Sequence, residues 1–364
     1  MKYSSIESEY LIQLIKCALK EQPLPSPPEN INWDTLIKLS KQQQVYSVIS
    51  VLLDSTVLPP AQAEELNAYS QSELIRLLAM KSEFEQFEKE LEDNQIKFMP
   101  LKGSVLREYY PQQKMRQMSD MDILYDYSKR DTLVKIMKSH GYRLTASCEN
   151  SDDFFKNPFY TFEWHRELFF EESDFCPHFD LWANAVADKE NRYKYHIEET
   201  EHFIYTICHM YKHYATNGCG VRFLCDIYLM LKKCCIHLEQ AFDKLEEIGI
   251  SDFSKDAVSL AYAVFDDNDV TDKQQKMLDF MLSNGVYGNM IVDYSQKLDA
   301  FNGSKFKYLL DRIFPSKKKM KADYRILEKK PYLLPAYYII RLCSKMKYNS
   351  KAAKQELKEI KKIK

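Results

Sequence analysis

The apolar positions of the first ninety residues recur at the spacing of amphipathic helices. One such pattern covers residues 5–20 and ends at a run of prolines. Asn32 is a typical N-cap residue and predicts a second helix over residues 33–53. Pro60 then stands at the first position of a third, long helix, where proline is favoured. The chain therefore begins with a helical region, which we assign to residues 1–94.

From residue 96 the pattern changes to short apolar runs bounded by turn residues, which are typical of strands. Helices are expected between these runs, and the spacing becomes helical again after Glu198. The predicted fold class is α+β, with a small mixed sheet between an N-terminal helical region and a C-terminal helical domain. The expected domains after the first are 95–198, 199–304 and a basic helical segment, 305–364. The predicted strands are 96–101, 121–125, 142–145, 160–170 and 175–182; the predicted helices between them are 104–110 and 129–141, and a hairpin turn is expected at 171–174.

Composition indicates a soluble globular protein, because 45% of the residues are hydrophobic and 29% are charged. The most apolar stretch, residues 332–343, is much shorter than the ~20 residues that span a bilayer. The first twenty residues lack the pattern of a secretory signal, so we expect a cytoplasmic protein. The 9 cysteines are an odd number without C-x2-C spacing. Reduced thiols are therefore expected rather than disulfides or a zinc site.

Charge is distributed unevenly along the chain. Residues 305–364 hold 19 Lys and Arg against 5 Asp and Glu, whereas residues 1–304 hold 32 against 48. A basic segment attracts phosphates, or it only balances an acidic body. We favour the second interpretation over nucleic-acid binding, because few aromatic residues alternate with the lysines.

Two short motifs suggest phosphate chemistry. In the first, a predicted strand ends in Gly103-Ser104 and turns into a helix. Such a turn exposes backbone N–H groups, and glycine allows a phosphate to approach closely. In the second, Asp120 and Asp122 lie two residues apart on a predicted strand, so their carboxylates share one face. Two adjacent anions need a cation, and carboxylate oxygens suit Mg²⁺ with phosphate oxygens as further ligands.

Asp180 supplies a third carboxylate that can join this pair, because it lies on another predicted strand. Three acids can hold two metal ions for in-line phosphoryl chemistry, which suggests nucleotidyl transfer. Two Mg²⁺ ions are the expected cofactors, and Mn²⁺ is a substitute. The structural alternative is a turn cap and a solvated strand edge for the two aspartates, and a simple tight turn for Gly103. It is less favoured because an Asp-x-Asp strand suits a sheet poorly.

In combination, these motifs resemble the active site of the polymerase-beta-like nucleotidyltransferase superfamily. More specifically, residues 95–230 resemble the bacterial family of uncharacterised nucleotidyltransferases. The resemblance implies that Gly103 and Ser104 hold a triphosphate, that Asp120 and Asp122 bind metal, and that Asp180 completes the site or deprotonates the acceptor. The residues that carry it are Leu101-Lys102-Gly103, Tyr110-Pro111, Arg116, Asp120-Met121-Asp122-Ile123-Leu124, Asp180-Leu181-Trp182, His209, Lys212-His213, Arg222 and Asp226.

Several side chains outside the acidic set have two interpretations. Lys102 and Arg116 either bind nucleotide phosphates or form surface salt bridges with Asp120 or Glu108. Trp182 either stacks on a base or packs in the core. Arg222 and Asp226 are most simply an ion pair within one helix.

His209, Lys212 and His213 share one face of a helix predicted over residues 201–216, with Thr200 as its cap. We consider them as contacts to phosphate or acceptor. Ordinary packing is the alternative, and a zinc site is disfavoured because it needs another ligand.

The first functional hypothesis is therefore a Mg²⁺-dependent enzyme that transfers a nucleoside monophosphate from a nucleoside triphosphate such as ATP and releases pyrophosphate. The acceptor is unknown, and a small molecule, a peptide, a protein or a tRNA would fit. The alternative is a non-catalytic nucleotide-binding or interaction module that retains the fold. A third and weaker hypothesis is that the basic tail docks on a membrane surface, but its apolar stripe is thin.

Overall fold

The computed structural model describes residues 1–148, 150–169, 175, 178–180, 182–216, 218–286, 304, 314–317, 320, 324 and 326–348. It divides into two compact units. The first contains residues 1–146 and 150–287, and the second contains 147–149 and 288–364. The predicted domain boundaries at residues 94 and 198 both fall inside the first unit, and they stay predictions.

The N-terminal helices form where the apolar spacing predicts them, with one difference. Asn32 caps its helix as expected, since its side chain accepts a hydrogen bond from the backbone N–H of Thr35 at 2.9 Å. The single helix predicted over 33–53 is wrong, because the chain turns at Gln44, where φ is 53°. The helices are α1 (Ile6–Leu19), α2 (Trp33–Gln42), α3 (Tyr46–Ile49) and α4 (Pro60–Asp93).

The central sheet has five strands in the order β1-β2-β5-β4-β3. Strands β2 and β5 are parallel, while β1 pairs with β2 and β4 with β5 in antiparallel directions. Strand β5 ends earlier than predicted, and β4 was not predicted because it begins with polar residues. The strands are β1 (Phe98–Pro100), β2 (Met121–Tyr125), β3 (Arg143–Ser147), β4 (Ser151–Lys156) and β5 (Tyr160–His165), and β6 (Ala185–Ala187) with β7 (Tyr195–Ile197) form a small second sheet.

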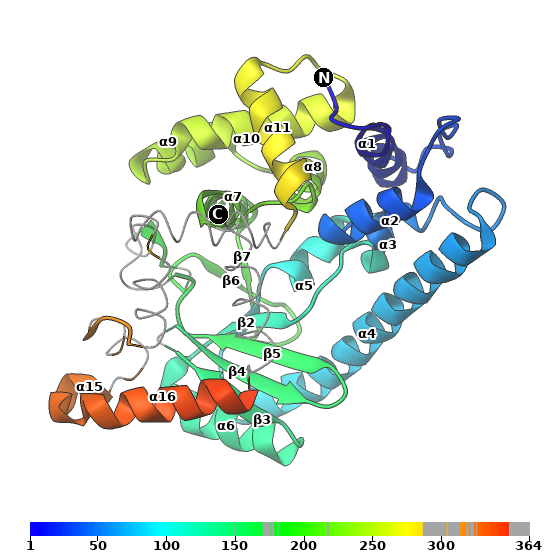
Figure 1. The fold of residues 1–364 in the computed structure, drawn as a ribbon. Coiled ribbons are helices and arrows are strands. Elements are labelled where there is room, and N and C mark those ends of the chain that lie inside the picture. Colours follow the sequence, from blue (N-terminus) through cyan, green and yellow to red (C-terminus); the bar gives the residue numbers. More distant parts are fainter. Residues whose placement is uncertain are drawn as a thin grey trace. The chain divides into compact units, whose positions relative to one another are not determined.

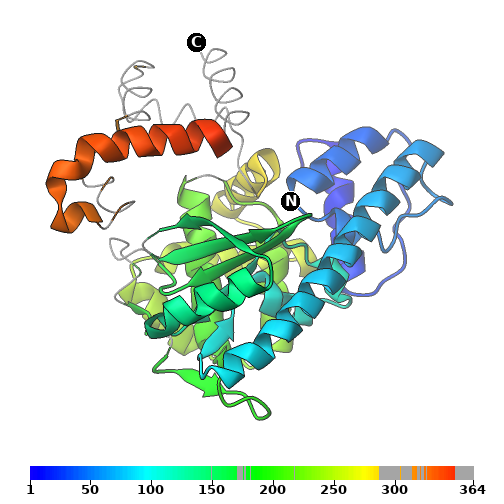
Figure 2. The ribbon, with the colours of Figure 1, turned by 90° about the horizontal axis from the view of Figure 1, so that it is seen from below.

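Helices cover one face of the central sheet with apolar side chains. Phe84 and Phe87 of α4 and Leu133 of α6 (Arg130–Ser139) belong to one buried cluster with the sheet residues Ile123 and Phe162. Figure 2 shows α4 and α6 along this face. The opposite face carries a smaller apolar cluster around Met99, Leu101 and Leu124, and the polar residues described below.

The remaining helices of the first unit share one hydrophobic core with α1–α3 (Figure 1). The buried side chain of Gln43, at the end of α2, connects these parts. Its Nε2 donates to the carbonyl oxygens of Met281 and Leu282 at 3.0 Å, and its Oε1 accepts from the backbone N–H of Val221 at 2.9 Å. These helices are α7 (Glu199–Thr216), α8 (Arg222–Lys233), α9 (Leu238–Glu247), α10 (Ser251–Asp266) and α11 (Asp272–Asn284).

The second unit contains the helices α15 (Ile326–Lys329) and α16 (Leu334–Tyr348). Among the described residues of the whole chain, no helix has the length and apolar character needed to cross a membrane. The thiols of Cys17, Cys148, Cys208, Cys219, Cys225, Cys234 and Cys235 are free, as predicted for these residues.

Replacing Gln43 should destabilise the first unit. In Gln43→Leu, the carbonyl of Leu282 and the N–H of Val221 lose their hydrogen bonds to Gln43, whereas the carbonyl of Met281 keeps the N–H of Gly285. Each unsatisfied buried group costs about 1–3 kcal/mol. We expect a loss of stability of at least this size in a denaturant titration. The matched control is Gln71→Leu on the exposed side of α4, which should change the free energy of unfolding by less than about 0.5 kcal/mol. Equal effects of the two variants would contradict the role assigned to Gln43.

Candidate active site

Strand β2 presents the two predicted aspartates. It was predicted as residues 121–125, and the structure has the same bounds. Asp122 is only 6% exposed, and Asp120 precedes the strand. Burial raises the pKa of Asp120, and the negative charge of Asp122 raises it further. The two carboxylates are therefore close enough to interact, as their spacing predicts.

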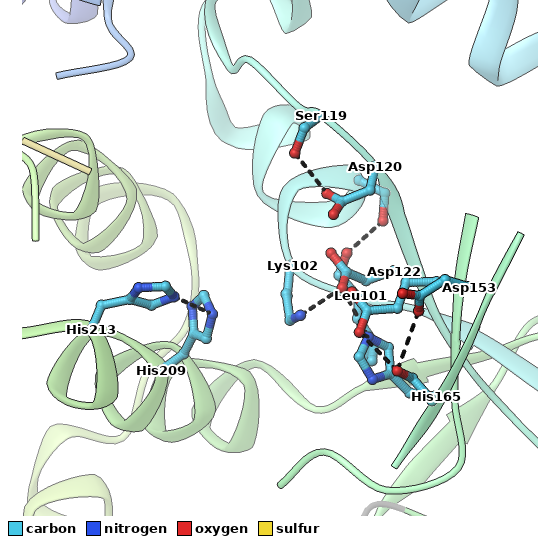
Figure 3. Close-up of polar contacts among 12 residues, drawn as sticks. Leu101, Lys102, Ser119, Asp120, Asp122, Asp153, His165, His209 and His213 are labelled. Atoms are coloured by element: carbon cyan, nitrogen blue, oxygen red, sulfur yellow. Dashed lines mark hydrogen bonds and ion pairs between the residues drawn. The ribbon is translucent and has the colours of Figure 1, made fainter. Parts of the chain in front are cut away.

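Asp122 is held by two nitrogen atoms. Its Oδ1 lies 2.5 Å from Nζ of Lys102 and 2.9 Å from Nε2 of His165 (Figure 3). Burial alone would raise the pKa of Asp122, but the Lys102 ammonium and the His165 hydrogen bond outweigh it and lower the pKa below its usual value. The buried carboxylate is thus ionised and depends on a neighbouring cation.

A third acidic residue, Glu163, lies beside Asp122 on the neighbouring strand. In the parallel register of β2 and β5, Asp122 is opposite Glu163, and His165 follows on the same face two residues later. One ligand atom from each of Asp122, Glu163 and His165 can be chosen so that all three lie within 4.8 Å of one another. Such a group of two carboxylates and one imidazole is able to hold a metal ion.

The acidic row continues onto β4, where Asp153 is opposite Glu163. The Ser151 hydroxyl donates to Glu163 Oε1 at 3.0 Å and lies 3.4 Å from Oδ1 of Asp153. Burial first and the charge of Glu163 second raise the pKa of Asp153 to about 6. Three adjacent strands therefore carry three carboxylates side by side.

The turn before α5 (Gly103–Leu106) lies across from this row. Lys102 adopts φ 49°, and a Cβ on Gly103 would lie 2.8 Å from Cγ of Met118. Glycine therefore fits this turn better than any other residue. The hydroxyl of Ser104 donates to the carbonyl oxygen of Leu101 at 2.6 Å, so it closes the turn.

The predicted phosphate ligand Arg116 is buried in an ion pair. Its Nε and Nη2 donate to the two carboxylate oxygens of Asp226 on α8, at 2.7 and 2.9 Å. The Tyr110 hydroxyl donates to the same carboxylate at 2.7 Å. Asp226 thus pairs with Arg116 rather than with Arg222, which donates to Gln44. The sequence could not show this, because Arg116 and Asp226 are 110 residues apart.

Helix α7 supplies the side of the site that faces the carboxylates. It begins at Glu199, so Thr200 is inside the helix, and the Glu198 carboxylate caps it by accepting from the N–H groups of Thr200 and Glu201. Nε2 of His209 and Nε2 of His213 are 3.2 Å apart. In Figure 3 both rings project from α7 toward Lys102 and Asp122.

These groups line one pocket of about 340 Å³, within the size range of small-molecule sites. We call it the carboxylate pocket. Its described lining includes every predicted site residue except Ser104 and Asp180. The predicted residues that line it are Lys102, Gly103, Arg116, Asp120, Asp122, His209, Lys212 and His213, joined by Glu163, Tyr205 and Phe223.

Asp180 lies elsewhere. None of the described residues within the strand predicted over 175–182 is in a strand, so that prediction is wrong for them. Asp180 is exposed, and its Oδ1 accepts a hydrogen bond from the backbone N–H of Ala183 at 3.2 Å. Trp182 packs edge-on against Tyr195, with ring centroids 5.6 Å apart. The predicted turn at 171–174 lies outside the described residues.

With this geometry established, comparison with known proteins identifies the family. A sequence model of the uncharacterised nucleotidyltransferase family matches residues 29–266, from the end of the first loop to the end of α10. The chain belongs to this family. No curated protein matches the chain. The residues that match the family model include every described residue that lines the carboxylate pocket except Val286.

Breaking the Arg116–Asp226 pair should destabilise this protein strongly. Asp226→Asn leaves the guanidinium of Arg116 buried without its counter-charge, which costs about 3–5 kcal/mol. Asp256→Asn is the control, because its partner Lys273 is largely exposed and such pairs contribute at most about 1 kcal/mol. Denaturant unfolding of both variants measures the difference, and a loss in Asp226→Asn no larger than in the control would refute the assignment.

The raised pKa of Asp153 should make the stability of the protein depend on pH. Burial and the charge of Glu163 raise this pKa to about 6 in the folded protein, from an ordinary value of 3.8. Between these values the folded state binds more protons, so this group's contribution to stability decreases as pH rises. Asp153→Asn should therefore raise stability at pH 7 and remove this slope. Melting temperatures from pH 4 to 8 with a chelator test it, and parallel curves for the two proteins would show that Asp153 titrates normally.

Proposed function

We propose that this protein transfers a nucleoside monophosphate from a nucleoside triphosphate, such as ATP, to a hydroxyl or phosphate acceptor and releases pyrophosphate. The observation that carries the proposal is the meeting of Asp120, Asp122 and Glu163 in one pocket with Lys102. The family match supports the reaction class. The acceptor is a small molecule, a peptide, a protein or a tRNA, and the free thiols of the chain suit a cytoplasmic reaction.

The donor set fits a divalent metal ion. Asp122 and Glu163 offer the hard oxygen ligands that Mg²⁺ prefers, and the His165 imidazole beside them also suits Mn²⁺. The ammonium of Lys102 keeps the buried carboxylate of Asp122 ionised, which is the form that binds a metal ion. When bound, the ion would neutralise phosphate charge and lower the pKa of the attacking hydroxyl.

In the proposed reaction, groups of the protein bind the phosphates and accept the proton of the acceptor. Lys102 and the backbone at Gly103 and Ser104 bind the phosphates, and the acceptor oxygen attacks the α-phosphorus as the bond to pyrophosphate breaks. The proton of an acceptor hydroxyl passes to a carboxylate, for which Glu163 is the best-placed third acid. Positioning and charge neutralisation then account for most of the rate.

Arg116 and Asp180 have roles in this proposal that differ from those predicted from the sequence. Because Arg116 is paired with Asp226, it positions the loop before Asp120 instead of binding phosphate. Asp180, predicted as the third carboxylate, is replaced by Glu163, because Glu163 lines the pocket. The role of Asp180 is tested together with that of Glu163.

Thermal unfolding with each nucleoside triphosphate, with and without Mg²⁺, tests the proposal. A ligand at a hundred times its dissociation constant adds about 2.7 kcal/mol of stability, which is easily seen in a melt. We expect at least one triphosphate to stabilise the wild type only with Mg²⁺. Glu163→Gln and Asp122→Asn should lose this effect, because each removes a carboxylate charge from the pocket.

Asp180→Asn is the matched control, since it removes the same charge from an exposed carboxylate. It should keep the Mg²⁺-dependent stabilisation. If Asp180→Asn loses the effect and Glu163→Gln retains it, the third carboxylate is Asp180. If no triphosphate stabilises the wild type at millimolar concentration, the proposed function fails.

A further inference from the structure

Four side chains with rings line the carboxylate pocket, beside polar residues of the same two helices. Tyr205, His209 and His213 of α7 and Phe223 of α8 all line it. We call these four residues the ring wall. Figure 3 shows its two imidazoles facing the carboxylates across the site. The pocket thus has one side suited to metal and phosphate and another of different chemistry.

The rings of this wall support one another. The imidazoles of His209 and His213 meet edge to face, with centroids 4.6 Å apart. The ring of Phe223 lies beside both of them, at centroid distances of 5.7 and 5.4 Å. Tyr205 stacks on His209 at 6.2 Å with an interplanar angle of 30°. Because each ring contacts another, the wall is a preorganised surface.

The imidazoles of the wall are uncharged near neutral pH. Burial lowers the pKa of His213 to about 4 and that of His209 well below its usual range. The positive charges of Lys102, Lys212 and Arg222 lower one or both further, and only Asp122 acts in the opposite direction on His209. Neutral imidazoles do not attract phosphate as cations do, so a phosphate-binding role for this pair is disfavoured.

The pair can still recognise a polar edge. Each neutral imidazole has one N–H group and one nitrogen lone pair. The hydrogen bond between the two Nε2 atoms uses the N–H group of one ring and the lone pair of the other. One Nδ1 therefore carries a hydrogen and the other a lone pair. The wall offers apolar ring faces, with the two imidazoles inclined at 82° to each other, together with one donor and one acceptor. These groups suit an uncharged heteroaromatic ring.

We propose that the ring wall is the subsite for the nucleobase of the donor nucleotide. This inference rests on the proposed function, because it places the triphosphate at Lys102 and the carboxylates on the other side. Stacking on aromatic and imidazole faces is tolerant of base identity, so the subsite contributes affinity for every nucleoside triphosphate. Trp182, the base contact considered from the sequence, packs instead against Tyr195.

The test compares Mg²⁺-ATP with Mg²⁺-tripolyphosphate, which has the phosphates without the base, in calorimetric binding measurements. In His213→Leu and in His209→Leu, the dissociation constant of ATP should rise at least about fivefold, the lower end of the loss when a base loses a stacking partner. The dissociation constant of tripolyphosphate should stay within about twofold. His213→Phe keeps a ring face and should retain most of the ATP affinity.

Tyr211→Leu is the control for removing a ring from α7, because Tyr211 lines another pocket and packs on Phe253. It should change neither constant. Equal weakening of both ligands in the histidine variants, or no weakening of either, would overturn the ring wall as a base subsite. If the wild type binds tripolyphosphate and ATP equally well, the inference fails while the proposed function stands. If it binds neither, the proposed function itself fails.

Discussion

The buried ion pair between Arg116 and Asp226 is the constraint on which the site depends. It joins the loop that leads into β2 to helix α8, and the Tyr110 hydroxyl binds the same carboxylate. A buried guanidinium left without its counter-charge is costly, so this loop has one strongly favoured position. Asp120 and Asp122 follow within six residues of Arg116. Their position relative to the ring wall is therefore set by the packing of the helices.

Neighbouring carboxylates in and beside the carboxylate pocket repel one another, and a bound cation would reduce this repulsion. Asp122, Glu163 and Asp153 are opposite one another on three adjacent strands. Among the described residues, Asp122 has an ion pair with Lys102 and a contact with the imidazole of His165. Burial first, and the charge of a neighbouring carboxylate second, raise the pKa of Asp153 and Asp120. In the proposed function, the metal ion of a metal–nucleotide complex would supply positive charge to the carboxylates, and the base would lie against the ring wall. The repulsion between the carboxylates thus favours binding of the proposed metal ion.

Much of this arrangement could be predicted from local patterns, and the remainder depends on contacts distant in sequence. Strand β2 and its two aspartates follow from strict alternation, so both were found. Glu163 follows the same alternation within β5, but only the parallel register with β2 places it beside Asp122. The break at Gln44 requires a positive φ that its residue type does not signal. The strand predicted around Asp180 is wrong for the described residues, because its alternating pattern is also compatible with the irregular structure found there, and the role of Asp180 stays a prediction.

The central claim is that Asp122 and Glu163 hold the metal ion of a metal–nucleotide complex. Electron paramagnetic resonance of Mn²⁺, titrated with and without a nucleoside triphosphate, tests it directly, because bound Mn²⁺ loses the sharp signal of the free ion. The account predicts that the wild type binds Mn²⁺ more tightly when nucleotide is present, and that Asp122→Asn and Glu163→Gln each weaken this binding at least about tenfold. Unchanged Mn²⁺ binding in both variants would contradict it.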